Sequence, residues 1–140
     1  MVDTKDLTIL DILEKNARTS FVDIAKKLDI TEAAIRKRIK KLEKEEVILG
    51  YKAYVNYKKL GYANKIIMGV DTTPKDYFKV MNRLKEFKEI KNLNTSSGDH
   101  MIMFEVWVKN MQELNDILDN VNAIDGVVKS CPAILHEEIN

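Results

Sequence analysis

The sequence contains little of what builds several common classes of protein. Its 140 residues include one cysteine, two prolines and five glycines. The single thiol, Cys131, cannot form an internal disulfide and suits a reducing cytoplasm. No apolar run approaches the ~20 residues of a transmembrane helix, and the acidic, amphipathic N-terminus differs from a signal peptide. We therefore expect a folded, soluble, cytoplasmic protein with one ordinary domain or two small ones.

Groups that carry out catalysis are also scarce. The only histidines are His100 and His136, and the chain has no phosphate-binding loop, dinucleotide fingerprint, Ser-His-acid order or metal-spaced cluster. Cys131 precedes Pro132 in an apolar segment, which favours packing over nucleophilic chemistry. We expect no enzymatic activity, no metal and no cofactor.

Positive charge is concentrated in one short segment. The net charge is only +1, yet six of the nine residues from Arg36 to Lys44 are basic and only Glu43 is acidic. Lysine-rich faces are common on solvated helices, so charge alone does not identify a function. The surrounding segment 21–44 adds a pattern, because it predicts two short helices joined at a tight turn, with Ser20 and Thr31 as their caps.

The second of these helices has an apolar spine and a basic outer face. Ile35, Ile39 and Leu42 recur at i, i+4 and i+7, whereas the lysines lie opposite and Arg38 lies nearer the packed side, where we expect a structural role. This arrangement is typical of a helix-turn-helix whose second helix enters the DNA major groove. The first half of that helix is predicted to read bases, and its second half and the start of the preceding helix to hold phosphates. The predicted DNA-binding residues are Thr19, Ser20, Thr31, Glu32, Ala33, Arg36, Lys37, Lys40, Lys41 and Lys44.

An earlier helix, Asp6–Asn16, completes a three-helix N-terminal domain over residues 1–50. Leu7, Leu10 and Leu13 are predicted to mark its buried side, which Ile9 and Ile12 widen. Residues 51–61 then alternate loosely and predict a β-strand linker.

Residues 62–140 predict a C-terminal domain with the order β-α-β-β-α-β. Strands are expected over 65–71, 90–97, 101–108 and 127–138, with helices starting at Thr73-Pro74 and Asn110, the first ending near Lys88. This order is the ferredoxin-like pattern, an antiparallel sheet with both helices on one face. The fold class is therefore α+β, with a helix-turn-helix domain followed by a ferredoxin-like βαββαβ domain.

The third strand of this domain is apolar on both faces. Ile102, Phe104, Val106 and Val108 alternate with Met101, Met103, Glu105 and Trp107. Only one face can pack on the helices, so we expect the other to pair with a second copy of the chain. The alternative is that the linker or the N-terminal domain covers it.

The chain resembles the Lrp/AsnC family of feast/famine regulators over nearly its whole length. The resemblance lies in the segments DLTILDILEKNART and LDITEAAIRKRIKKLEKEEVILGY, the SSGD turn before an apolar strand, and the DGV start of the last strand, in this order and spacing. It implies a DNA-binding transcription regulator with a C-terminal effector-binding and oligomerisation domain. It also implies homo-dimers and often octamers, and an amino acid bound between dimers as the expected effector.

The resemblance places the effector near the hairpin between the second and third strands, with part of the last strand opposite. Gly98 would let a ligand approach the backbone, and Asp99 would accept from its ammonium group. Met101 stands where the family commonly has an acid, and His100 where an aromatic is usual. The implied effector-binding residues are Ser97, Gly98, Asp99, His100, Met101, Pro132, Ala133 and Ile134.

The sequence leaves one rival function open. The helix-turn-helix would in that case bind protein or RNA, and the chain would act as an effector-sensing or interaction module. Steep salt dependence of binding to duplex DNA, together with preference over random sequence, separates the two.

Overall fold

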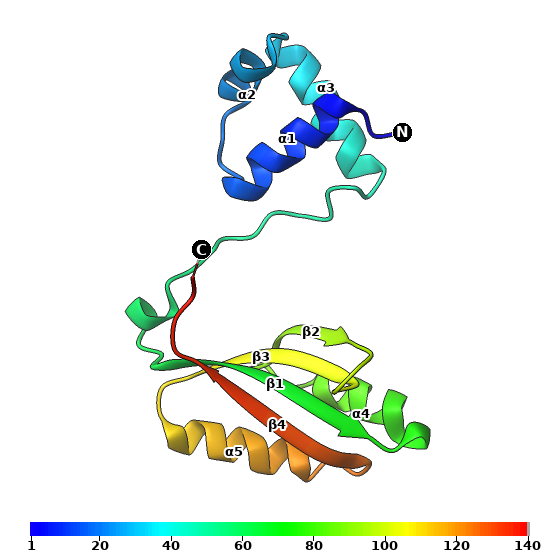
Figure 1. Ribbon diagram of the computed structural model, residues 1–140, viewed down its shortest axis with the longest axis vertical. Coiled ribbons are helices and arrows are strands. Elements are labelled where there is room, and N and C mark those ends of the chain that lie inside the picture. The colour runs from blue at the N-terminus through cyan, green and yellow to red at the C-terminus, as the bar shows by residue number, and fades with distance from the viewer. Residues whose placement is uncertain (140) are drawn as a thin grey trace. The chain divides into compact units, whose positions relative to one another are not determined.

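A computed structural model describes residues 1–139 and divides the chain into two compact units, Met1–Tyr54 and the residues from Val55 onward (Figure 1). Each unit has its own cluster of buried apolar residues. Among the helices of the described residues, none is long and apolar enough to cross a membrane.

The N-terminal unit consists of α1 (Thr4–Lys15), α2 (Phe21–Leu28) and α3 (Glu32–Lys44). Ile9, Ile24 and Ile35, one from each helix, are fully buried at its centre. Ser20 and Thr31 cap α2 and α3 as predicted, because their hydroxyl oxygens accept from the backbone N–H groups three residues on. The predicted spine of α3 is buried as well.

The predicted buried side of α1 was wrong at one position. Leu7 is 60% exposed, whereas Asp6, Ile9 and Leu13 face inward. Asp6 can be buried because it forms an ion pair with Arg38 of α3. A helical wheel drawn for α1 alone does not include this partner and favours leucine on the buried side.

The predicted β-strand linker was also wrong for the single chain. Residues 51–56 have no regular secondary structure, and a 3-10 turn, η1 (Tyr57–Leu60), follows them. A strand needs a neighbouring strand to satisfy its backbone groups, and within the described residues this segment pairs with none.

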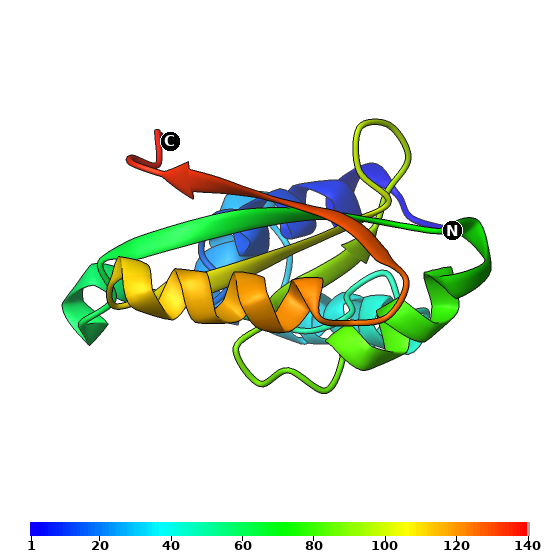
Figure 2. The ribbon, with the colours of Figure 1, turned by 90° about the horizontal axis from the view of Figure 1, so that it is seen from below.

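The C-terminal unit is a four-stranded antiparallel sheet in the order β2-β3-β1-β4. Its strands are β1 (Asn64–Thr72), β2 (Lys91–Thr95), β3 (Ile102–Val108) and β4 (Val127–Leu135), and its helices are α4 (Tyr77–Leu84) and α5 (Met111–Asn122). Figure 2 shows both helices on one side of the sheet, as the ferredoxin-like pattern predicts. They cover a fully buried row that includes Ile66, Met68, Phe104 and Val106.

Several elements are shorter than predicted, including β2, which spans Lys91–Thr95 instead of 90–97. The helix expected from Thr73 to about Lys88 begins as a 3-10 turn, η2 (Pro74–Asp76), and α4 ends at Leu84. The last strand ends at Leu135 instead of Glu138, because β1, its partner, offers no pairing beyond Lys65. The residue at which a helix or strand ends depends on contacts with the neighbouring element. The hydrophobic periodicity of the sequence does not reveal those contacts.

Candidate DNA and effector sites

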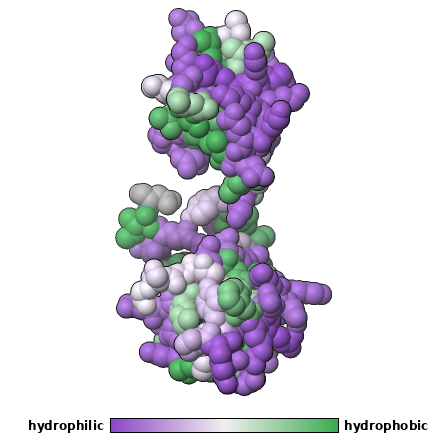
Figure 3. Space-filling model, turned by 90° about the vertical axis from the view of Figure 1, so that its right-hand side faces the viewer, coloured by the Kyte–Doolittle hydropathy of each residue, from purple (hydrophilic) through white to green (hydrophobic). Residues whose placement is uncertain are grey.

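The outer face of α3 is the strongest candidate for a nucleic-acid interface. Thr31 fixes its start through a 3.1 Å bond from the Ala34 N–H, and the buried spine holds the opposite face on α1 and α2. All eight residues that the sequence predicts on this helix and its cap are exposed. On the face shown in Figure 3, hydrophilic residues cover most of the N-terminal unit.

The lysines of α3 are largely uncompensated. Among residues 1–139, no acidic side chain forms an ion pair with Lys37, Lys40 or Lys44. Lys41 has a 3.9 Å ion pair with Glu45 and donates to the Met1 carbonyl at 3.3 Å. Unpaired exposed lysines have freedom to follow a phosphate backbone, because they lose no internal partner on binding.

Arg36, in contrast, is held in place from two sides. Its Nη2 pairs with Glu32 Oε1 one turn earlier at 3.0 Å, and its guanidinium lies 5.0 Å from the ring centre of Phe21, the first residue of α2. An arginine stacked on an aromatic ring keeps a defined plane, which suits bidentate contact with a guanine edge. Sequence reasoning proposed Arg36 and Glu32 separately and missed the part of Phe21.

Arg38 has the structural role that the sequence predicts. Its Nη1 donates to Asp3 Oδ2 at 2.7 Å and to Asp6 Oδ1 at 2.8 Å, so it ties α3 to the start of α1. The hydrogen bond from Arg38 lowers the pKa of Asp3, and the two carboxylates raise the pKa of Arg38. These bonds make Arg38 part of the frame that positions α3.

The start of α2 offers one hydroxyl group to a phosphate more readily than the other. Thr19 Oγ1 donates to the Asn16 carbonyl at 2.8 Å, so its proton is already used. Ser20 Oγ accepts from the Asp23 N–H at 3.1 Å and keeps its proton. Of the two predicted phosphate contacts, the geometry therefore favours Ser20.

The predicted effector hairpin joins β2 to β3. The Ser96 N–H donates to the Met101 carbonyl at 2.9 Å, Ser96 Oγ donates to the His100 carbonyl at 2.5 Å, and Gly98 has φ +121. A positive φ of this kind is accessible to glycine at little cost. Ser97, Gly98 and Asp99 are exposed at the tip, so Asp99 has water around it.

Two residues that sequence reasoning missed lie under this hairpin. Asp71, near the end of β1, accepts from the Met101 N–H through Oδ1 at 3.2 Å, and its Oδ2 lies 3.1 Å from His100 Nδ1. Gly69 leaves room for the His100 ring, since a Cβ at position 69 would lie 2.3 Å from that ring. Both residues precede the hairpin by about 30 positions, and only the pairing of β1 with β3 brings them to it.

The last three predicted effector residues lie on β4. Pro132, Ala133 and Ile134 pair with Met68, Ile67 and Ile66 of β1. Successive strand residues face opposite sides of a sheet. Ala133 therefore shares a face with Gly69, over which the His100 ring lies, whereas Pro132 and Ile134 lie on the other face.

The sheet face opposite the helices carries a polar and aromatic cluster. Glu105, 8% exposed, accepts from Trp107 Nε1 at 2.5 Å and lies 3.7 Å from Lys65 Nζ. The rings of Tyr57 and Tyr62 pack on Trp107 at 5.9 and 5.7 Å between centres. Tyr57 of the linker and Tyr62, just after it, therefore cover one end of this face, which agrees with part of the alternative to dimer formation.

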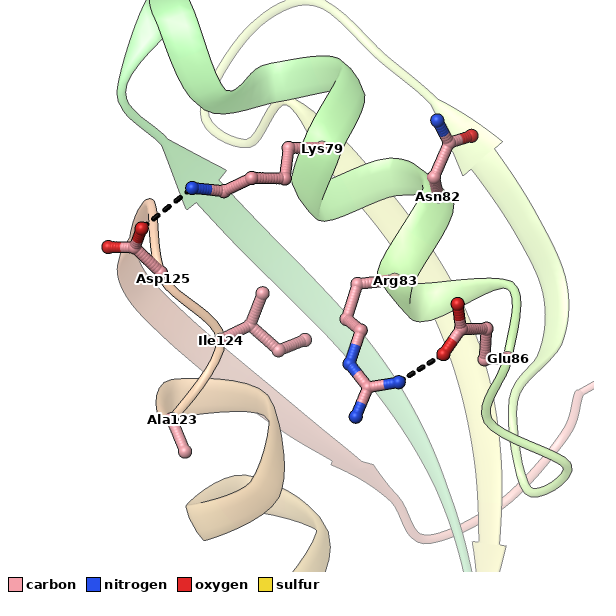
Figure 4. Close-up of a pocket in the computed structure, with 7 residues that line it drawn as sticks. All are labelled: Lys79, Asn82, Arg83, Glu86, Ala123, Ile124 and Asp125. Atoms are coloured by element: carbon pink, nitrogen blue, oxygen red, sulfur yellow. Dashed lines mark hydrogen bonds and ion pairs between the residues drawn. The ribbon is translucent and has the colours of Figure 1, made fainter.

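A groove of about 520 Å³ lies between α4 and the connection from α5 to β4. Figure 4 shows Lys79 pointing to Asp125 and Arg83 pointing to Glu86 across its rim. The hydrogen bond from Lys79 to Asp125 is the largest cause of a raised Lys79 pKa. Because each cation is already paired with an acid, this groove presents no uncompensated charge to a ligand.

No group of three or more histidine, cysteine or acidic side chains among the described residues is arranged to hold a metal ion. Cys131 is half-buried in β4, and His136 is exposed.

Comparison with known proteins agrees with both units. A family model for winged helix-turn-helix DNA-binding matches residues 2–48, and one for the Lrp/AsnC ligand binding domain matches residues 65–136. The HTH-type transcriptional regulator LrpA of Pyrococcus horikoshii is 51% identical over 140 residues, covering 99% of both chains.

Solved structures show the same fold. Escherichia coli AsnC aligns with a TM-score of 0.84 at 26% identity, over 99% of this chain and 94% of that one. A Neisseria meningitidis transcriptional regulator, solved as a complex with L-methionine, aligns with a TM-score of 0.85 at 17% identity, over 100% and 93%. With both halves matched and a full-length relative at 51% identity, the chain belongs to the Lrp/AsnC family of transcriptional regulators and is not an enzyme.

Proposed function

We propose that this DNA-binding regulator reads its operator with the first half of α3 and holds the DNA backbone with the second half. The exposed, unpaired row of Lys37, Lys40 and Lys44 above a buried apolar spine carries this proposal. Arg36 supplies the sequence preference, because Phe21 and Glu32 fix the plane of its guanidinium. Ala33 is small enough to approach a thymine methyl group.

The experiment is selection of an operator from random duplex DNA, followed by titration at several salt concentrations. Each lysine–phosphate contact contributes about 0.9 to the slope of log affinity against log salt. Lys40→Ala and Lys44→Ala should each lower that slope by about 1 and weaken all sequences equally. Arg36→Ala should instead lose discrimination at one base pair, worth about 1–3 kcal/mol. Equal binding of operator and random duplex would contradict the proposal.

The second part of the proposal is that an amino acid, bound between dimers at the hairpin, controls the regulator. Support comes from the match of residues 65–136 to a ligand binding domain and from the Neisseria meningitidis relative, which was solved with L-methionine. Ala133 of β4 lies on the same sheet face as Gly69, over which the His100 ring of the hairpin lies, and Pro132 and Ile134 lie on the other face.

Dimers are proposed to form through the sheet face opposite the helices. Half-buried Ile67, Met103 and Leu135 lie on this face, and Ile67 and Leu135 are the cross-strand neighbours of Glu105 and Lys65 in the polar and aromatic cluster. A ligand changes the assembly only if it binds one arrangement more tightly than another. We place this action in the cytoplasm, where a reduced Cys131 is stable.

The test is the mass in solution by light scattering, with and without a mixture of the twenty amino acids. A change in assembly, followed by splitting of the mixture, would name the effector. An unchanged mass and unchanged thermal stability would contradict amino-acid control and leave the DNA-binding proposal intact.

A further inference from the structure

The carboxylate of Asp71 differs from the other acids at the hairpin in its surroundings. The Asp71 side chain is 25% exposed, whereas Asp99 at the tip of the hairpin is exposed to solvent. One of its oxygens is fixed by the Met101 N–H and the other by His100 Nδ1. Asp71 is therefore a preorganised, partly desolvated acceptor placed at the base of the turn.

The charge of Asp71 is not neutralised by a permanent cation. Among the described residues, its one ionic partner is His100, which carries charge only when protonated. Lys129 stands opposite Asp71 in the pairing of β1 with β4, but the two form no ion pair. A neutral imidazole can donate a hydrogen bond to the carboxylate and leaves its negative charge in place.

Asp71 also retains unused acceptor capacity. An ionised carboxylate offers about four lone-pair sites, and the contacts with Met101 and His100 occupy two of them. An ammonium group has three donors and no acceptor, so it complements both the remaining lone pairs and the charge. In a partly desolvated position such a contact is stronger than at the exposed Asp99.

We propose that Asp71 holds the α-ammonium group of the amino-acid effector, with His100 fixing the carboxylate for that contact. This inference rests on the proposed effector function and assigns it a residue outside the hairpin itself. Gly69 is part of the same arrangement, because the His100 ring occupies the space where any larger residue would place its Cβ. Asp99 is then a peripheral residue.

The experiment compares each effector amino acid with its α-hydroxy acid, which has the same side chain and carboxylate but no ammonium group. Calorimetric titration of the full chain should show the hydroxy acid binding about 10–100-fold more weakly, the range for a hydrogen-bonded charged group. Asp71→Asn should lower the affinity for the amino acid by a similar factor, and this variant should bind the amino acid and the hydroxy acid almost equally. Asp99→Asn removes the rival acceptor that the family resemblance implies, and it should keep the wild-type discrimination if Asp71 holds the ammonium group.

Folding of Asp71→Asn is checked by thermal unfolding and by operator binding without ligand, with Asp71→Ser as a second variant. Equal affinity of the wild-type protein for amino acid and hydroxy acid would overturn the inference. So would discrimination that survives in both Asp71 variants, or that disappears in Asp99→Asn instead. If the wild-type protein binds none of the twenty amino acids, the proposed effector function itself fails, a result distinct from loss of the Asp71 contact alone.

Discussion

Replacement of Arg38 by methionine should unfold the N-terminal unit more easily without touching its apolar core. Arg38 is the one partner that compensates the charge of Asp6 among the described residues, and the Asp6 side chain is only 5% exposed. Methionine keeps the length of the arginine stem and removes both charged hydrogen bonds. Asp6 would remain buried with the Asp3 N–H as its hydrogen-bond donor.

The magnitude follows from burial. A hydrogen bond between charged groups contributes about 1.5–3 kcal/mol, and the second bond, to the half-exposed Asp3, adds little because water screens it. We expect a loss of about 2 kcal/mol in the free energy of unfolding, or roughly 10 °C in the midpoint for a unit of this size.

The assay is urea denaturation of the full chain, followed by circular dichroism, with hydrogen exchange of the α1 amides to localise the effect. Lys37→Met is the matched control, since Lys37 is exposed and has no ion pair within the described residues. Fluorescence of Trp107, the single tryptophan, reports the C-terminal unit and should not change. Equal stability of Arg38→Met and Lys37→Met would refute the reasoning. Weaker DNA binding at unchanged stability would show that Arg38 contacts DNA instead.

Three further outcomes are expected. The pKa of Asp3 is lowered in the folded protein, chiefly by the hydrogen bond from Arg38. The hydrogen bond between Arg38 and Asp3 therefore contributes to stability above the ordinary aspartate pKa, and this contribution is lost as the pH falls through the lowered pKa. The free energy of unfolding, followed by acid titration, should differ between wild type and Arg38→Met in that pH window. Parallel curves would contradict this prediction. Phe21→Leu should reduce preference for the operator over random DNA by several-fold and leave the salt slope unchanged, because it frees Arg36 without removing a phosphate contact; Phe21→Tyr should restore it in the same binding titration. Gly69→Ala should displace the His100 ring and cost about 1–3 kcal/mol in thermal unfolding; unchanged stability and ligand affinity would show that the ring has another position.

The parts of the fold that local periodicity determines could be predicted from the sequence. The α3 spine, its cap at Thr31 and the exposed lysines follow from spacing within one helix. The order of strands and helices in the C-terminal unit follows in the same way, because each element has its own apolar pattern.

What could not be predicted depends on contacts between distant residues. The inward turn of Asp6 depends on Arg38, 32 positions later, and the position of Asp71 under the hairpin depends on the register of β1 with β3. Neither appears in a helical wheel or a strand alternation. The β-strand expected after residue 50 failed for a related reason, since no strand of the described chain lies beside it to pair with.

The close approach of His100 to Gly69 has a consequence for the evolution of the family. A side chain at position 69 and a ring at position 100 compete for one volume, so neither position can change freely while the other is kept. Among relatives, a residue larger than glycine at the first position should accompany a smaller or differently placed residue at the second.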